Sequence, residues 1–222
     1  MNKLLLALIL AAAPVAAAPS LPIVKEYYTM DSMGCMLLQE CTEDVKRIRS
    51  IQDIRDSYPD SDYDRVAIEF DNIIESFDKI GVGVFLAHQK YFPIGHRGVY
   101  HTVGNNLFLN DAFMHRQIAL MAVTRHEGWH AAQDCMAGTI ENSMLAIIHN
   151  EDDVPKIWQD IATRTYRDFP DAIPWEKEAF WASMSGNMTS NALDACVAGE
   201  MWKVYPPTPL TGEWLKKYGY ID

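Results

Sequence analysis

The chain has 222 residues, of which 49% are hydrophobic and 22% charged, and this composition is typical of a globular protein. Its 30 Asp and Glu residues outnumber its 19 Lys and Arg residues, which gives a formal net charge of −11. Proteins that bind phosphate backbones depend on Lys and Arg, so we expect no nucleic-acid partner. At this length a single domain is expected.

The N-terminus has the form of an export signal. Lys3 supplies a positive charge, residues 4–13 are apolar and residues 15–18 are small, as in a signal peptide with its cleavage site. The apolar stretch is shorter than the roughly 20 residues that span a bilayer. We predict a cleaved signal peptide over residues 1–18, no membrane span in the remaining 19–222, and a secreted or periplasmic protein.

The cysteines agree with export. All four lie after the predicted signal peptide, at Cys35, Cys41, Cys135 and Cys196. An even number of cysteines in an oxidising compartment favours two disulfides, and we expect the pairs Cys35–Cys41 and Cys135–Cys196. No CxxC pair occurs in the sequence, which disfavours a zinc site made of cysteines.

The middle of the chain predicts a helix, a strand and a hairpin in that order. Between residues 63 and 80 the apolar positions recur mostly every three or four residues, which predicts an amphipathic helix. A short apolar strand over residues 82–86 follows. Residues 99–103 and 106–110 predict two strands joined by a turn at Gly104-Asn105.

The next helix, for which Asp111 is the expected cap, leads into His126-Glu127-Gly128-Trp129-His130. Four residues advance a helix by about one turn and roughly 6 Å, so both imidazoles project from one face and can bind one ion. Zinc suits imidazole nitrogen, and a third protein ligand leaves a fourth position for water. Glu127 is placed to take a proton from that water.

These elements resemble the zincin metallopeptidases. No third histidine follows shortly after His130, which disfavours the metzincin branch, and the chain looks more like a gluzincin, the thermolysin-like branch. The resemblance implies an α+β fold, with a small sheet and edge hairpin packed on the HExxH helix and a helical C-terminal subdomain. It covers a catalytic core at 63–185, between an N-terminal extension at 19–62 and a helical tail at 186–222 of one domain.

In gluzincins a glutamate on a later helix completes the site. The resemblance implies Glu176, which has the small residue Ala179 three positions later, and Glu178 is the alternative. Two positions turn a helix by about 200°, so only one of these glutamates can point at the metal. Thermolysin-like enzymes also use a His or Tyr to stabilise the oxyanion, for which Tyr166 and His149 are candidates.

We therefore expect an exported zinc-dependent metallohydrolase, a peptidase acting on peptide or protein substrates, with Zn²⁺ as its cofactor. The strand at 106–110 is expected to pair with an extended substrate. Gln133 and Asp134 are expected to face solvent, with orientation of a ligand histidine as the alternative. Two other functions stay open: a non-catalytic exported protein with a structural zinc site, and a metal-free interaction domain. The sequence leaves substrate identity and oligomeric state open.

Overall fold

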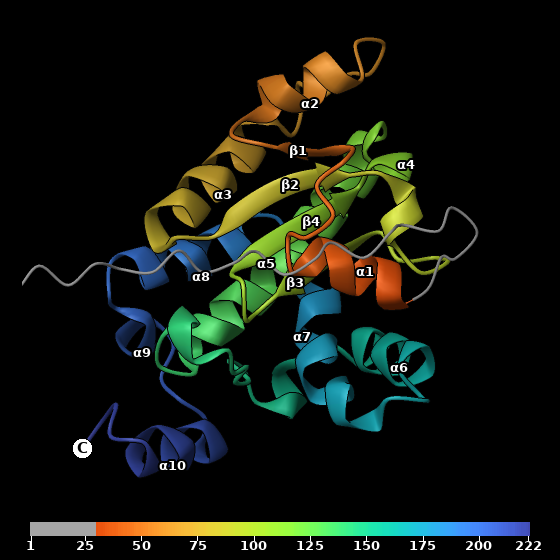
Figure 1. Ribbon diagram of the computed structural model, residues 1–222. Coiled ribbons are helices and arrows are strands. Elements are labelled where there is room, and N and C mark those ends of the chain that lie inside the picture. The colour runs from red at the N-terminus through yellow and green to blue at the C-terminus, as the bar shows by residue number, and fades with distance from the viewer. Residues whose placement is uncertain (1–29) are drawn as a thin grey trace, which may run out of the picture.

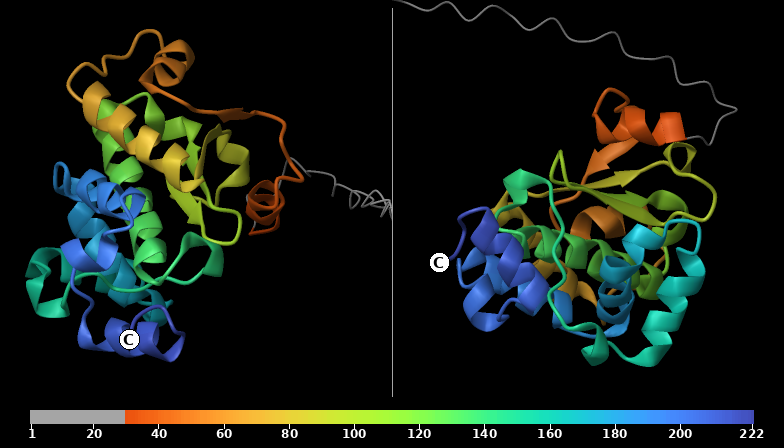
Figure 2. Two further views of the ribbon diagram at one scale, coloured as in Figure 1. Left: turned by 90° about the vertical axis from the view of Figure 1, so that its left-hand side faces the viewer. Right: turned by 90° about the horizontal axis from the view of Figure 1, so that it is seen from below.

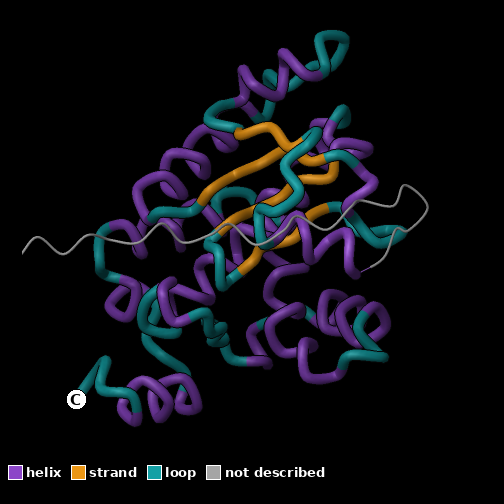
Figure 3. Tube along the Cα trace, in the orientation of Figure 1, coloured by secondary structure: helices purple, strands orange, loops and turns teal. Residues whose placement is uncertain are grey.

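The structure is a computed structural model that describes residues 30–222, so the predicted signal peptide lies outside the described residues. The fold is α+β, as predicted, with one small mixed sheet and a larger number of helices (Figure 1). The strands gather in one part of the molecule, and the segments that follow them are helices and loops (Figure 3). None of the helices within residues 30–222 has the length and apolar character needed to cross a membrane.

The helices and strands have the following bounds. The strands are β1 (Val45–Arg47), β2 (Gly83–Ala87), β3 (Gly98–His101) and β4 (Asn106–Asn110). The α-helices are α1 (Met30–Leu37), α2 (Ile51–Ser57), α3 (Ala67–Ile80), α4 (Asp111–Met114), α5 (Gln117–Met136), α6 (Lys156–Thr165), α7 (Ile173–Met184), α8 (Met188–Val197), α9 (Met201–Val204) and α10 (Pro209–Lys217). Short 3₁₀ turns are η1 (Gln89–Tyr91), η2 (Ile140–Asn142), η3 (Glu151–Asp153) and η4 (Pro170–Ala172).

The sheet has the strand order β1-β2-β4-β3. The predicted hairpin is confirmed, because β3 pairs antiparallel with β4 from Gly98↔Leu109 to His101↔Asn106. β4 also pairs with β2, in parallel, and β1 pairs antiparallel with β2. The expectation that residues 106–110 pair with a substrate is therefore wrong, since β4 already has a neighbour on both sides. In the sheet formed by residues 30–222, β1 and β3 are the edge strands.

The sheet is covered on both faces. Phe108 of β4 packs with Met36 of α1 and Tyr91 of η1, while the alternate residues Leu107 and Leu109 join the main core with α3, α5 and α8. The views in Figure 2 show α1 on one side of the sheet and these longer helices on the other. A strand buried on both faces has an apolar run instead of an alternating pattern, as β4 does.

The helix predicted over residues 63–80 is confirmed as α3, and Gly81 ends it in a left-handed conformation (φ +85°) that glycine adopts readily. The expected cap of the next helix needs a correction. The side chain of Asn110, not Asp111, accepts the hydrogen bond from the Ala112 N–H, and the segment divides into α4 and α5.

Both predicted disulfides are confirmed. Cys35–Cys41 closes a short loop at the end of α1, with a Cα–Cα distance of 5.3 Å. Cys135–Cys196 joins the last turn of α5 to α8, with a Cα–Cα distance of 6.1 Å. The second disulfide therefore fixes the HExxH helix to the C-terminal part of the chain.

Candidate metal centre

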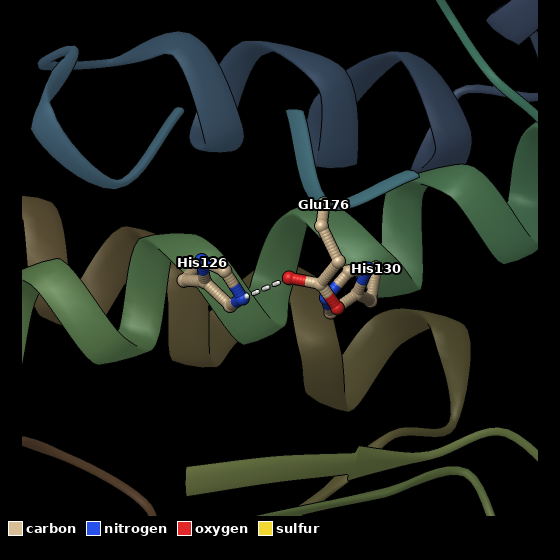
Figure 4. A group of neighbouring side chains, drawn as sticks. All are labelled: His126, His130 and Glu176. Carbon is tan, nitrogen blue, oxygen red and sulfur yellow. Dashed lines mark ion pairs between the residues drawn. The ribbon is translucent and has the colours of Figure 1, made fainter. Parts of the chain in front are cut away.

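Three side chains from α5 and α7 converge. Nε2 of His126 lies 3.1 Å from Oε2 of Glu176, and Nε2 of His130 lies 3.4 Å from Oε1 of the same carboxylate. All three ligand atoms lie within 4.8 Å of one another. In Figure 4 the carboxylate of Glu176 points toward the two imidazoles. The group could hold one metal ion, and it combines the imidazole and carboxylate ligands that zinc sites use.

Packing around α5 fixes the direction of the two imidazoles. A Cβ atom at Gly128, between the histidines, would lie 2.8 Å from Cγ2 of Thr189 and 3.1 Å from Cζ of Phe77. Glycine is therefore required at this position for the close approach of α5 to α8 and α3. A helix held this closely on two sides presents its ligands from a rigid element.

The charges in the group are strongly coupled. Burial lowers the pKa of His130, but the nearby carboxylates of Glu176 and Glu127 outweigh burial and raise this pKa to about 9. Burial raises the pKa of Glu176, but His130 and His126 outweigh it and hold this pKa far below its ordinary value. The carboxylate and the imidazoles therefore stabilise each other's charged forms.

One oxygen of Glu176 supports the fit of this group to a metal ion. Oε2 is buried and forms no hydrogen bond of normal geometry with residues 30–222, although Nε2 of His126 lies 3.1 Å away. A buried carboxylate oxygen without a hydrogen bond is unfavourable. A cation bound between the two atoms would remove this penalty, so the residues fit a metal ion.

The structure brings Glu176, and not Glu178, to the histidines. Glu178 is buried on another side of α7, where its carboxylate accepts hydrogen bonds from Trp129 Nε1 (3.1 Å) and from the main-chain N–H groups of Ile148 and His149 (3.0 and 2.5 Å). Burial raises its pKa, and these hydrogen bonds oppose the rise. Glu178 therefore holds the loop before α6 against α5.

Gln133 connects Glu178 to a candidate ligand. Its Nε2 donates to Oε2 of Glu178 (2.8 Å) and to the main-chain oxygen of Trp175 (3.1 Å). The amide oxygen therefore faces Nδ1 of His130 at 2.8 Å, and because this oxygen can only accept, Nδ1 must carry the proton. The other nitrogen, Nε2, is the one that faces Glu176, which is the arrangement that metal binding requires.

The expectation that Gln133 and Asp134 face solvent is wrong, because both are 0% exposed. The hydroxyl of Tyr100 donates to Oδ2 of Asp134 at 3.0 Å, and burial raises the pKa of Asp134 to about 7. This contact attaches β3 to α5.

The three-residue spacing from His130 to Gln133 was the available signal for the role of Gln133, because residues three apart are neighbours on a helix surface. No sequence signal pointed to Tyr100.

Glu127 lies against the edge strand. Its Oε2 accepts a hydrogen bond of 2.9 Å from the main-chain N–H of Tyr100. The main-chain oxygen of Arg97 accepts a hydrogen bond from the main-chain N–H of Asn110 in β4. Along an antiparallel pair, residues that bond to the partner strand alternate with residues that do not. Gly98 and Tyr100 therefore direct their main-chain groups away from β4. A Cβ atom at Gly98 would lie 2.5 Å from Cγ1 of Val123 and 3.2 Å from Cγ of Glu127. Among residues 30–222 no strand pairs with this outer edge of β3, and Glu127 lies directly beside it.

Of the two oxyanion candidates, Tyr166 interacts with this group. Burial raises its pKa, and the charges of Glu176 and Glu127 raise it further, so the phenol keeps its proton at neutral pH. The ring of His149 packs instead against Trp129 and Trp181, with centroids at 5.6 and 5.2 Å. These two ring contacts make the imidazole of His149 an aromatic packing group, and burial lowers its pKa.

Comparison of the chain with protein-family models, with curated proteins and with solved structures found no match. The site is defined by its own geometry: two imidazoles and a carboxylate that could share an ion, and a second carboxylate at the edge of the sheet.

Proposed function

We propose that this protein is an exported zinc-dependent peptidase of the gluzincin type. The observation that carries the proposal is the convergence of His126, His130 and Glu176 within 4.8 Å beside a carboxylate, Glu127, at the outer edge of β3. Two histidines and a glutamate leave a fourth zinc position open, and an open position distinguishes a catalytic site from a closed structural one.

The surrounding residues have the properties that peptide hydrolysis needs. When bound, zinc polarises a substrate carbonyl and lowers the pKa of water. Glu127 accepts the proton of the attacking water and passes it to the leaving amine. The phenol of Tyr166, whose pKa is raised, donates a hydrogen bond to the oxyanion.

The edge strand holds the substrate. The outward main-chain groups of Gly98 and Tyr100 are free of β4, and an extended peptide that pairs with them adds a further strand to the sheet. The peptide takes over the N–H of Tyr100, which releases Glu127 for proton transfer. Export is supported by the two disulfides, which persist in oxidising compartments.

The test is hydrolysis of a mixture of random-sequence decapeptides by the zinc-loaded protein, followed by mass spectrometry, with Glu127→Gln as the matched variant. We expect cleavage by the wild type and a loss of about 10²-fold or more in rate for the variant, with equal zinc content. A protein that binds zinc and cleaves nothing would instead indicate a structural zinc site. Absence of both zinc and cleavage would indicate a metal-free interaction domain.

A further inference from the structure

A hollow of about 610 Å³ lies at the N-terminal end of α5. It is lined by Arg97, just before β3, by Arg116, Ile118 and Ala122 at the start of α5, and by Met184 at the end of α7. None of these residues belongs to the candidate metal centre. The hollow is therefore a second feature of the surface, formed where the edge strand, α5 and α7 meet.

The hollow lies close to the metal centre, along the contact between α5 and α7. Glu176, Phe180 and Met184 are spaced four residues apart, so they lie on one face of α7. Ala122 and His126 are related in the same way on α5, and the rings of His126 and Phe180 pack with centroids 5.0 Å apart. The hollow thus begins one helical turn, about 6 Å, from the metal centre.

The hollow combines positive charge with apolar walls. Arg97 and Arg116 contribute two positive charges and Asp62 one negative charge, within a chain whose net charge is −11. No ion pair among residues 30–222 includes either arginine. Ile118 and Met184 are apolar yet 75% and 56% exposed. Such a surface suits a ligand with a carboxylate and methylene groups.

We propose that this hollow binds a carboxylate of the peptide substrate, on the C-terminal side of the bond that is cut. The proposal rests on the proposed peptidase function. Antiparallel pairing is slightly more stable than parallel pairing, and a peptide antiparallel to β3 has its C-terminal part beside the start of β3, where Arg97 lies. Ala122 and Arg116 lie about 6 and 15 Å from His126 along the axis of α5. At about 3.4 Å per residue of an extended peptide, these distances correspond to roughly two to four peptide residues after the cut bond.

The carboxylate has two sources, an acidic side chain or the free C-terminus of a short peptide. Both present the same planar oxygens to the forked guanidinium donors of Arg97 and Arg116. A glutamate side chain additionally places its methylene groups against Ile118 and Met184. The chemistry recognised is the same in both cases, and peptides that differ only in one of these groups separate the sources.

The experiment uses the decapeptide mixture with the zinc-loaded full-length mature protein, and then two matched pairs of single peptides. In the first pair a Glu three residues after the cut bond is replaced by Gln, and in the second a free C-terminus is replaced by an amide. Arg97→Gln and Arg116→Gln are compared with Arg49→Gln, which removes an equal charge at an exposed position outside the hollow. Binding of the same peptides to the zinc-loaded Glu127→Gln protein is measured by fluorescence anisotropy.

We expect the acidic or free-acid member of at least one pair to be cleaved and bound about three- to fivefold better than its partner, since exposed ion pairs contribute up to about 1 kcal/mol. Each of the two hollow variants, Arg97→Gln and Arg116→Gln, should abolish most of that preference. Arg49→Gln should keep the preference, and added salt should reduce it. If the protein cleaves peptides without preferring a carboxylate, or if both hollow variants keep the preference, this proposal is wrong while the peptidase function stands. Absence of cleavage with any peptide would overturn the peptidase function and this proposal with it.

Discussion

Gln133 Nε2 donates a hydrogen bond of 2.8 Å to Oε2 of Glu178, and this contact decides which nitrogen of His130 keeps a proton when the imidazole is neutral. Because the amide nitrogen is fixed on Glu178, the amide oxygen faces Nδ1 of His130. Nε2 is left to face Glu176. Glu178 thus acts on the metal centre through Gln133, without being a ligand.

Replacing Gln133 by Met tests this chain of hydrogen bonds. The change preserves side-chain length but leaves the buried Nδ1–H of His130 without its acceptor, and partners of this kind typically contribute ten- to a hundredfold to metal affinity. We expect zinc affinity, measured by competition with a chelator, to fall by about that factor. The exposed substitution Glu213→Gln is the control, and an affinity equal to that of the wild type in Gln133→Met would contradict the assignment.

Gly98→Ala tests the approach of the edge strand to α5. The added Cβ would lie 2.5 Å from Cγ1 of Val123 and 3.2 Å from Cγ of Glu127, so β3 must move and Glu127 with it. We expect peptide hydrolysis to fall by about tenfold or more while zinc content stays at the wild-type value. Gly34→Ala is the matched control, because a Cβ there meets nothing within 4 Å in the described part of the chain, residues 30–222. Unchanged hydrolysis in Gly98→Ala would argue against substrate binding along β3.

The buried carboxyl of Asp134 should make stability depend on pH. Burial raises its pKa in the folded protein to about 7, from an ordinary value of 3.8, so the folded state holds this proton more tightly than the unfolded state does. The free energy of unfolding contributed by this group is therefore greatest below pH 3.8, falls as the pH rises to 7, and stays constant above that value.

Asp134→Asn keeps an acceptor for Tyr100 and removes the titration. Relative to the wild type, the variant should gain about 2–4 kcal/mol in unfolding free energy between pH 4 and pH 7. Urea unfolding in the presence of a chelator measures this difference without a contribution from bound metal. A difference that does not change with pH would show that Asp134 is not held in the neutral form.

The elements that the sequence predicted well have a strong local signal. The apolar period of α3 and the turn residues before β4 are properties of short segments, and both elements were placed to within four residues. β1 was missed because the three residues Val45–Arg47 carry no period, and they become a strand only by pairing with β2. The interior position of β4 is likewise a property of the sheet and not of residues 106–110.

The same limit applies to the site. The spacing of His126 and His130 predicted their common direction, because both lie on one helix. The choice between Glu176 and Glu178 depends on how α7 is rotated against α5, which no local pattern encodes, and the family resemblance favoured the residue that the structure brings to the histidines. Tyr100 and Asp134 lie far apart in sequence, so their contact follows only from the packing of β3 on α5.

The measurement that tests the central claim most directly is the zinc content of the purified mature protein, determined by elemental analysis after zinc loading and dialysis. We expect about one zinc per chain in the wild type, in Glu127→Gln and in Glu178→Gln, and almost none in His126→Ala and Glu176→Ala. Absence of zinc from the wild type, or its full retention in Glu176→Ala, would contradict the assignment of His126, His130 and Glu176 as a metal site.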